Sequence, residues 1–301
     1  MKILLANNIL GGLTGSETWI YAMKEELESL NHEVITYTPN QNINNKEKID
    51  LAIINHNTCL NKLKELDCIK IFTSHGILPE LEQPIGGADI YVSVSEEVQF
   101  NLSKKGFKSV IIRNGINCDY FKKTRETNSA VKNILFSSNY KDKYSLRLEK
   151  ILNLIGINIT INGKIRAKIL KAGKQLGIKI EIIGINNKIS NVMEAINRAD
   201  LVIGLGRTAY EAMACERNVI IYDYNGGDGF CTPEKMLEFR KNNCSGRRYK
   251  INFSVNQLKN EILKYNQENG KQLREYILNN NNIKKTTQEY LKIYYELTPK
   301  Y

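Results

Sequence analysis

Cysteine pairs and histidine clusters are missing from this chain of 301 residues. Its cysteines show no Cys-x-x-Cys spacing and its three histidines lie far apart, at positions 32, 56 and 75. A metal site built from protein side chains is therefore not expected. Unpaired thiols, in a chain that shows no signal peptide, predict a cytoplasmic protein.

Long hydrophobic runs are also missing. No apolar segment approaches the roughly 18 residues that a membrane-spanning helix needs, so any contact with a membrane is expected to be peripheral. Acidic residues are scarce in one part of the chain: residues 1–120 carry a net charge of −4 and residues 121–301 a net charge of +15, which gives +11 for the whole.

The basic half of the chain suits an anionic ligand such as a nucleotide, and nucleic acid or an anionic membrane surface are the alternatives. Many of its lysines lie beside asparagines, as in NNNNIKK at 279–285, which is typical of a solvated surface. No aromatic residues alternate with these lysines in a way that would stack nucleic-acid bases, so DNA is the less favoured partner.

The length of the chain and the alternation of its strands with helices predict two Rossmann-like α/β domains, because a single core stops growing at roughly 250 to 300 residues. A polar segment at 120–132 has no apolar periodicity and marks the boundary. We expect one domain over 1–122, a second over 132–282, and a final helix over 283–301. Strands are expected in the second domain near 133–136, 157–161, 178–183, 200–204 and 218–222.

Residues 199–229 are the most informative segment. A short apolar strand ends at Gly204, a turn with Gly206 follows, the helix-forming run TAYEAMAC begins at Thr208, and a second strand comes next. Ligands of such sheets lie at the carboxyl ends of the strands. There Arg207 can bind a phosphate, the amides at Gly206 and Thr208 add partial positive charge, and Glu211 can accept hydrogen bonds from a ribose.

This segment resembles the donor site of the retaining glycosyltransferases with the GT-B fold, family 4 in particular, in which the Glu of a Glu-Ala-Met-Ala motif holds the nucleotide ribose. Glu211 is that Glu in this chain, and the alternative is an ordinary carboxylate one turn into a helix. A second Glu, eight positions earlier in the family, is replaced by Ile203. The resemblance implies two domains that face a central cleft, and a last helix that returns to the N-terminal domain.

A glycine loop follows the first strand, KILLA at 2–6, in the segment ILGGLTGSE. In the glycosyltransferases that the chain resembles, this loop can meet the donor phosphates or the acceptor, so Gly12, Thr14, Gly15 and Ser16 are candidates for donor binding. Ser16 is also a candidate N-cap for a helix over 17–30. The second strand runs into Pro39-Asn40 without the acidic residue that a dinucleotide site requires, so NAD is not expected. A tight turn that binds nothing is the alternative.

Three further segments resemble landmarks of the same family. His75 in TSHG corresponds to the His that reaches the donor sugar, although a structural, hydrogen-bonded His is an equal alternative. Ser95-Glu96 corresponds to the end of the family's Val-Ser-x-Ser-Glu segment, which we interpret as a helix cap, and Asn114-Gly115 begins the NGI segment that corresponds to the turn closing the N-terminal domain.

The donor diphosphate needs cationic partners. Family members supply them from a Gly-Arg followed by a Lys after the first C-terminal strand, where this chain has FSSNYKDK at 136–143. The resemblance then places Lys143 at the Lys position, with Lys141 close by, and Ser137-Ser138 at the Gly-Arg position. Arg207 is expected to supply the missing guanidinium, with Arg247 and Arg248 as reserves.

The resemblance as a whole implies a glycosyltransferase that moves a sugar from a nucleotide-diphosphate sugar with retention, without a metal or other cofactor. Arg207 and Lys143 would stabilise the leaving diphosphate and His75 would orient the sugar. The acceptor is unidentified: a glycan, a lipid-linked sugar and a modified DNA base are all open. Two other functions stay open as well, a sugar-nucleotide epimerase and a non-catalytic module that binds nucleotide or nucleic acid.

Overall fold

The computed structural model describes the chain except residues 13, 43–47, 140–162, 185–186, 188 and 299–301. The chain divides into two compact units. Unit 1 contains Met1–Asn117 and Asn279–Tyr301, and unit 2 contains Cys118–Leu278. The sequence-based limits are 1–122, 132–282 and 283–301, so the second unit begins well before the expected residue 132, and the other divisions differ by a few residues.

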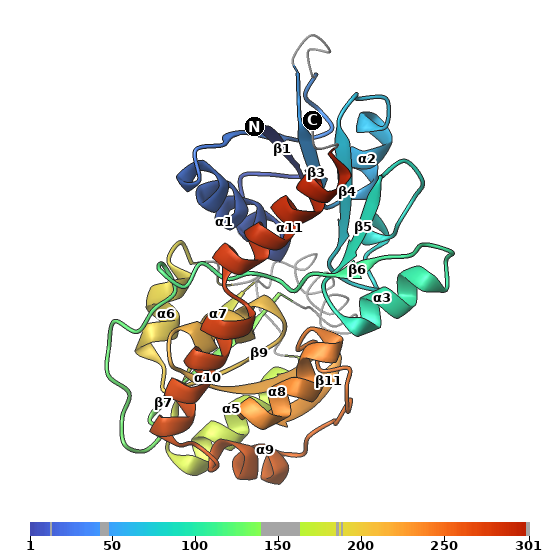
Figure 1. Cartoon of the computed structure of the whole chain (residues 1–301). Coiled ribbons are helices and arrows are strands. Elements are labelled where there is room, and N and C mark those ends of the chain that lie inside the picture. The colour runs from blue at the N-terminus through green and yellow to red at the C-terminus, as the bar shows by residue number, and fades with distance from the viewer. Residues whose placement is uncertain (13, 43–47, 140–162, 185–186, 188, 299–301) are drawn as a thin grey trace, which may run out of the picture. The chain divides into compact units, whose positions relative to one another are not determined.

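Unit 1 is built on a parallel sheet of six strands in the order β2-β1-β3-β4-β5-β6 (Figure 1). The strands are β1 Lys2–Ala6, β2 Glu33–Tyr37, β3 Leu51–Ile54, β4 Ile69–Ser74, β5 Ile90–Ser93 and β6 Val110–Ile111. The helical segments of this unit are α1 Gly15–Ser29, α2 Asn57–Leu63, the 3-10 turn η1 Glu80–Glu82, α3 Glu96–Ser103 and α11 Ile283–Leu297.

Alternation along the strands of unit 1 creates two apolar layers, because successive side chains point to opposite faces of a sheet. One face packs against α1 and α11, and its buried residues include Ile3, Leu5, Leu51, Ile53 and Ile71. The opposite face packs against α2, and its buried residues include Leu4, Ala6, Ala52, Ile54 and Phe72. Both faces are thus covered, which explains why these strands are almost wholly apolar.

The last helix, α11, packs on unit 1 beside α1 (Figure 1), as the family resemblance implies. Tyr290 is the central residue of this contact: its hydroxyl lies 2.9 Å from Thr73 Oγ1, and its ring lies edge-on to Trp19 at 5.8 Å between centroids. Burial raises the pKa of Tyr290 above its usual value, so the phenol keeps its proton and can serve this hydrogen bond.

Unit 2 is built on a sheet of five strands in the order β11-β10-β9-β7-β8. The strands are β7 Asn133–Ser138, β8 Lys179–Gly184, β9 Leu201–Gly204, β10 Asn218–Asp223 and β11 Gly226–Phe230. The helical segments are α5 Lys164–Leu176, α6 Val192–Arg198, α7 Arg207–Ala214, α8 Pro233–Phe239, the 3-10 turn η2 Arg240–Asn242, α9 Val255–Ile262 and α10 Gln267–Asn280.

Four of the strands expected in the second domain are present, as β7, β8, β9 and β10. The strand expected near 157–161 lies outside the described residues. Strand β11 is absent from the sequence-based expectation because its sequence, GGDGF, reads as a turn. It nevertheless pairs antiparallel with β10, and Gly227 is needed there because a Cβ would lie 2.5 Å from the Phe253 ring and 2.7 Å from the Ile221 carbonyl.

Candidate functional site

The carboxyl edge of the unit 2 sheet carries the segment singled out by the sequence. Strand β9 ends at Gly204, where a Cβ would lie 3.3 Å from the Thr208 side chain and 3.4 Å from the Ser137 carbonyl. Gly206 then adopts φ 54° and ψ −124°, which side-chain-bearing residues avoid, and its amide donates to the Cys244 carbonyl at 2.8 Å. This tight turn places the N-terminus of α7 at the edge of the sheet.

Arg207 and Glu211 lie one helical turn apart on α7 and form an ion pair, with Arg207 Nε 2.7 Å from Glu211 Oε1. Only 12 % of the Arg207 side chain and 8 % of the Glu211 side chain are exposed. Burial raises the pKa of Glu211, and the guanidinium of Arg207 acts in the opposite direction. The two residues that the sequence assigned to phosphate and to ribose are therefore neighbours in a single buried pair.

Strand β7 contributes two serines to the same edge. Ser137 Oγ lies 3.5 Å from Thr208 Oγ1, and Ser138 Oγ donates to Asp223 Oδ2 at 2.7 Å. Asp223 ends β10 and is buried, and its burial raises the pKa of its carboxyl to about 6. Asp223 was not among the site residues predicted from the sequence, although an acidic residue directly after the apolar strand NVIIY was a visible signal.

Four other cationic residues are predicted from the sequence as partners of the donor diphosphate, or as reserves for that role. Lys141 and Lys143 lie outside the described residues. Arg248 forms an ion pair with Glu238 of α8, and this places it on a partly exposed surface of unit 2. Arg247 and Arg248 belong to a turn.

The carboxyl edge of the unit 1 sheet carries a row of polar side chains. Asn7 follows β1, Asn55 follows β3 and His75 follows β4, and these three strands are neighbours in the sheet. Asn55 Nδ2 lies 3.5 Å from Asn7 Oδ1, and Asn55 Oδ1 lies 3.1 Å from His75 Nε2. The sequence analysis identified His75 in this row but neither of the two asparagines.

His75 is held on both sides of its ring. Nδ1 lies 3.0 Å from Asn114 Oδ1, and the ring lies edge-on to Trp19 at 5.2 Å between centroids. Two of the family landmarks, the TSHG and NGI segments, are therefore joined by a direct contact. Both asparagines present Oδ1, an acceptor, to the ring, so these contacts hold the orientation of the imidazole without selecting one of its tautomers.

The glycine loop of unit 1 is closed by a carboxylate. Glu17, with 2 % of its surface exposed, accepts hydrogen bonds from the Gly12 amide at 2.6 Å, the Thr14 amide at 3.0 Å and Thr14 Oγ1 at 2.6 Å. A Cβ at Gly12 would lie 2.8 Å from this carboxylate. A donor phosphate that binds these amides would have to replace Glu17.

Helix α1 begins two residues earlier than the sequence suggested. Gly15 is its first residue and Thr14 occupies the N-cap position, which corrects the expectation that Ser16 caps the helix. Thr14 is favoured because Glu17, three residues later, completes a capping box with it. Ser95, in contrast, caps α3 as expected, since its Oγ accepts from the Val98 amide.

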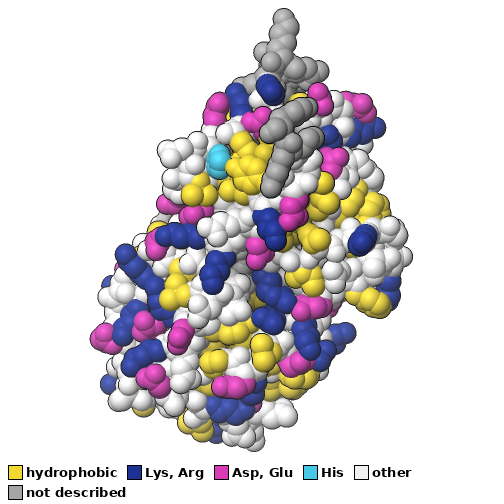
Figure 2. All heavy atoms as spheres, in the orientation of Figure 1, with side chains coloured by type: hydrophobic (Ala, Val, Ile, Leu, Met, Phe, Trp, Pro, Cys, Tyr) yellow, Lys and Arg dark blue, Asp and Glu magenta, His cyan; other side chains and the backbone are white. Residues whose placement is uncertain are grey.

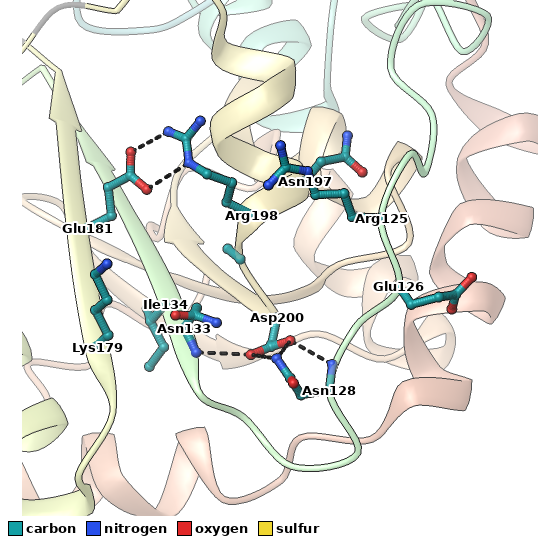
Figure 3. Close-up of a pocket in the computed structure, with 11 residues that line it drawn as sticks. Arg125, Glu126, Asn128, Asn133, Ile134, Lys179, Glu181, Asn197, Arg198 and Asp200 are labelled. Carbon is teal, nitrogen blue, oxygen red and sulfur yellow. Dashed lines mark hydrogen bonds and ion pairs between the residues drawn. The ribbon is translucent and has the colours of Figure 1, made fainter.

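A cavity of about 270 Å³ opens at the opposite, amino-terminal edge of the unit 2 sheet (Figure 3). Its charged side chains largely bind one another: Arg198 Nη2 lies 2.6 Å from Glu181 Oε1. Asp200 accepts hydrogen bonds from the amides of Asn128, Lys132 and Asn133. The cavity lies away from Arg207 and Glu211. Because its charged side chains largely pair with one another, we interpret it as part of the fold and not as a ligand site.

Two kinds of site have no support in the described residues. No helix among them is long and apolar enough to cross a membrane. No group of three or more His, Cys, Asp or Glu side chains in that part of the chain is placed to hold a metal ion.

Comparison with solved structures shows the fold. Anabaena HepE in complex with UDP and glucose matches with a TM-score of 0.61 at 14 % identity, over 99 % of this chain and 100 % of that chain. AviGT4, a glycosyltransferase involved in avilamycin A biosynthesis, matches with a TM-score of 0.57 at 11 % identity, over 98 % and 97 % of the two chains.

An α-glucosyltransferase in complex with UDP and a 13-mer DNA containing an HMU base matches with a TM-score of 0.54 at 12 % identity, over 98 % of this chain and 99 % of that chain. No protein-family model and no curated protein sequence matches the chain. The chain thus has the fold of these glycosyltransferases, which confirms the GT-B architecture predicted from its motifs.

Proposed function

We propose that this protein is a glycosyltransferase that takes a sugar from a nucleotide-diphosphate sugar. The observation that carries the proposal is the carboxyl edge of unit 2, where the Gly206 turn presents the N-terminus of α7 together with Arg207 and Glu211. Backbone amides and a guanidinium suit a diphosphate, and a buried carboxylate suits a ribose diol. Solved proteins of the same fold contain UDP, which makes uridine nucleotides the first donors to test.

In the proposed reaction an acceptor hydroxyl attacks the anomeric carbon from the face that the diphosphate leaves, so that configuration is retained. The new bond joins the acceptor oxygen to that carbon, the bond to the diphosphate breaks, and the proton passes to the departing phosphate. Arg207, the amides of α7 and Lys143 stabilise the charge that develops on the leaving group, each by about 3 kcal/mol. His75 orients the sugar, and no metal takes part.

The acceptor is proposed only as a class: a glycan, a lipid-linked sugar or a modified DNA base. The epimerase and the non-catalytic module predict different products. An epimerase converts one sugar nucleotide to another without releasing nucleoside diphosphate, and a binding module releases and converts nothing.

Release of free nucleoside diphosphate tests the proposal. The protein is incubated with UDP-, GDP-, ADP- and dTDP-sugars, and the free diphosphate is quantified. We expect slow hydrolysis of one donor by the unaltered chain, and a loss of about 100-fold in Arg207→Ala. Glu268→Ala, an exposed carboxylate on α10, serves as the control and should keep full activity. Equal release by both variants, or no release from any donor, would overturn the proposal.

A further inference from the structure

Asp223 stands at the carboxyl edge of β10 in an unusual setting. The hydrogen bond from Ser138 Oγ to Asp223 Oδ2 joins the ends of β7 and β10, although β9 lies between these two strands. Strand β9 ends at Gly204, which pairs with Ile221 of β10. Ser138 and Asp223 both lie beyond this end of β9. The pair therefore lies at the same edge of the sheet as the turn that leads to Arg207 and Glu211.

Two groups donate to the Asp223 carboxylate, the Ser138 hydroxyl and the Tyr224 amide. Asp223 is 4 % exposed, and no described Lys or Arg forms an ion pair with it. Its carboxyl pKa is raised by burial, and is lowered only in part by the Ser138 hydroxyl and the Tyr224 amide. Its charge also contributes to the pKa of Tyr222, which burial raises to about 12.

Asp200, in the same unit, shows what a structural carboxylate looks like (Figure 3). Three backbone amides and the side chain of Asn128 donate to it, and these hydrogen bonds outweigh its burial, so the pKa of Asp200 is lowered. Asp200 lies at the amino edge of the sheet and Asp223 at the carboxyl edge. A buried carboxylate with a raised pKa at the carboxyl edge of a parallel sheet lies where such folds bind ligands, and is a candidate for a binding site.

We propose that Asp223 determines donor specificity, by accepting a hydrogen bond from a hydroxyl of the transferred sugar. This inference rests on the proposed function. A carboxylate repels a diphosphate, so the group it suits is a neutral hydrogen-bond donor, and in a sugar nucleotide the hydroxyls supply this. Ser138 acts as a positioning residue, because its hydrogen bond to one oxygen of Asp223 fixes the direction of the other.

The first test compares binding of sugar nucleotides with binding of their parent diphosphates by calorimetry. UDP-, GDP-, ADP- and dTDP-glucose and the four diphosphates serve as probes. In Asp223→Asn we expect affinity for the preferred sugar nucleotide to fall about 10- to 100-fold, as one charged acceptor is lost. Affinity for the parent diphosphate should change less than about twofold, because Arg207 and Glu211 are intact.

The second test identifies the hydroxyl. Donors whose sugars are epimers or lack single hydroxyls are compared on the unaltered chain and on Asp223→Asn. For the donor that lacks the bound hydroxyl, Asp223→Asn should no longer lower the affinity, because the interaction that the substitution removes is already missing from that donor. Asp200→Asn is the matched control and should affect all donors alike, since Asp200 is a buried carboxylate at the opposite edge of the same sheet that accepts from three backbone amides.

The third test follows the affinity of the sugar nucleotide against pH, and separates a positioning role from a structural one. On the unaltered chain affinity should weaken as pH falls below about 6, and Asp223→Asn should lose this dependence. Ser138→Ala keeps the carboxylate but removes a hydrogen bond that lowers its pKa, so the weakening should begin at higher pH. Ser138→Ala also provides a readout if Asp223→Asn folds poorly.

The outcomes separate the two proposals. If the unaltered chain binds neither a diphosphate nor a sugar nucleotide, the proposed function itself fails. If it binds both, and Asp223→Asn weakens both equally or neither, then only the role of Asp223 fails. A pH profile unchanged in both variants would likewise overturn that role.

Discussion

Arg207 Nε lies 2.7 Å from Glu211 Oε1, so the guanidinium that suits a diphosphate and the carboxylate that suits a ribose are partners before any nucleotide binds. Both side chains are largely buried, which makes the loss of either one costly to the other. A nucleotide that contacts both residues replaces the ion pair between them with one contact from Arg207 to a phosphate and one from Glu211 to the ribose. Phosphate binding and ribose binding should therefore be coupled.

Glu211→Ala is expected to weaken binding of the nucleoside diphosphate by about 1.5 to 3 kcal/mol, because the ribose loses a charged acceptor. Calorimetry on the unaltered chain and the variant measures this change. Glu268→Ala on α10 is the control for removal of a carboxylate. Unchanged affinity in Glu211→Ala would contradict the assignment of Glu211.

The coupling itself can be measured with Arg207→Ala, Glu211→Ala and the double variant. Residues in direct contact show interaction energies of about 0.5 to 3 kcal/mol, so the two single losses of affinity should not add. Strict additivity would mean that the pair seen in the structure has no part in nucleotide binding.

Glu17 is expected to hold the glycine loop of unit 1 in place. Glu17→Ala leaves the amides of Gly12 and Thr14 without their acceptor, and should lower the free energy of unfolding by about 2 to 4 kcal/mol. Urea denaturation measures this loss. Glu28→Ala, at the other end of α1 in an exposed pair with Lys24, should change stability by less than about 0.5 kcal/mol. An equally mild effect of Glu17→Ala would rule out this role.

Asp223→Asn is expected to stabilise the protein above pH 6. The folded chain holds the proton of Asp223 up to about pH 6, whereas the unfolded chain releases it near the ordinary aspartate pKa of 3.8, so stability falls as pH rises between these values. The shift corresponds to roughly 3 kcal/mol at most. Denaturant unfolding near pH 8 should show the full gain in the free energy of unfolding, and this gain should shrink as the pH is lowered toward about 4. A variant that is less stable than the unaltered chain at both values would refute this.

Chelators should leave turnover intact. No cluster of metal-binding side chains lies in the described part of the chain, and Arg207 offers a cation in place of a metal. Donor hydrolysis in excess EDTA measures this directly. Loss of activity that Mg²⁺ or Mn²⁺ restores would show that a metal takes part.

Duplex DNA should bind weakly, in spite of the charge of +15 on residues 121–301. Figure 2 shows Lys and Arg side chains interspersed with Asp and Glu on the visible face. Affinity that depends on phosphate contacts falls steeply with salt, by about 0.9 in the log-log slope for each phosphate. We expect no retention at about 0.2 M salt, and retention there would make a modified DNA base the leading acceptor.

Local sequence determined much of the fold and part of the site. The apolar run of β9, the glycine turn and the helix-forming TAYEAMAC all lie within one short segment, and each acts on its own neighbours in the chain. Even the pairing of Arg207 with Glu211 follows from the sequence, because residues four apart lie on the same face of a helix. Strands β7, β8 and β10 followed from apolar periodicity in the same way.

Tertiary structure decided the contacts that turn these elements into a site. His75 is held by Asn55 and Asn114, residues 20 and 39 positions away, and Asp223 is held by Ser138, 85 positions away. Such contacts depend on which strands become neighbours and where each one ends, and no local pattern encodes that order. The glycine strand β11 was hidden for the same reason: its glycines fit because Phe253 and Tyr222 lie against them, and only the folded chain brings those rings together.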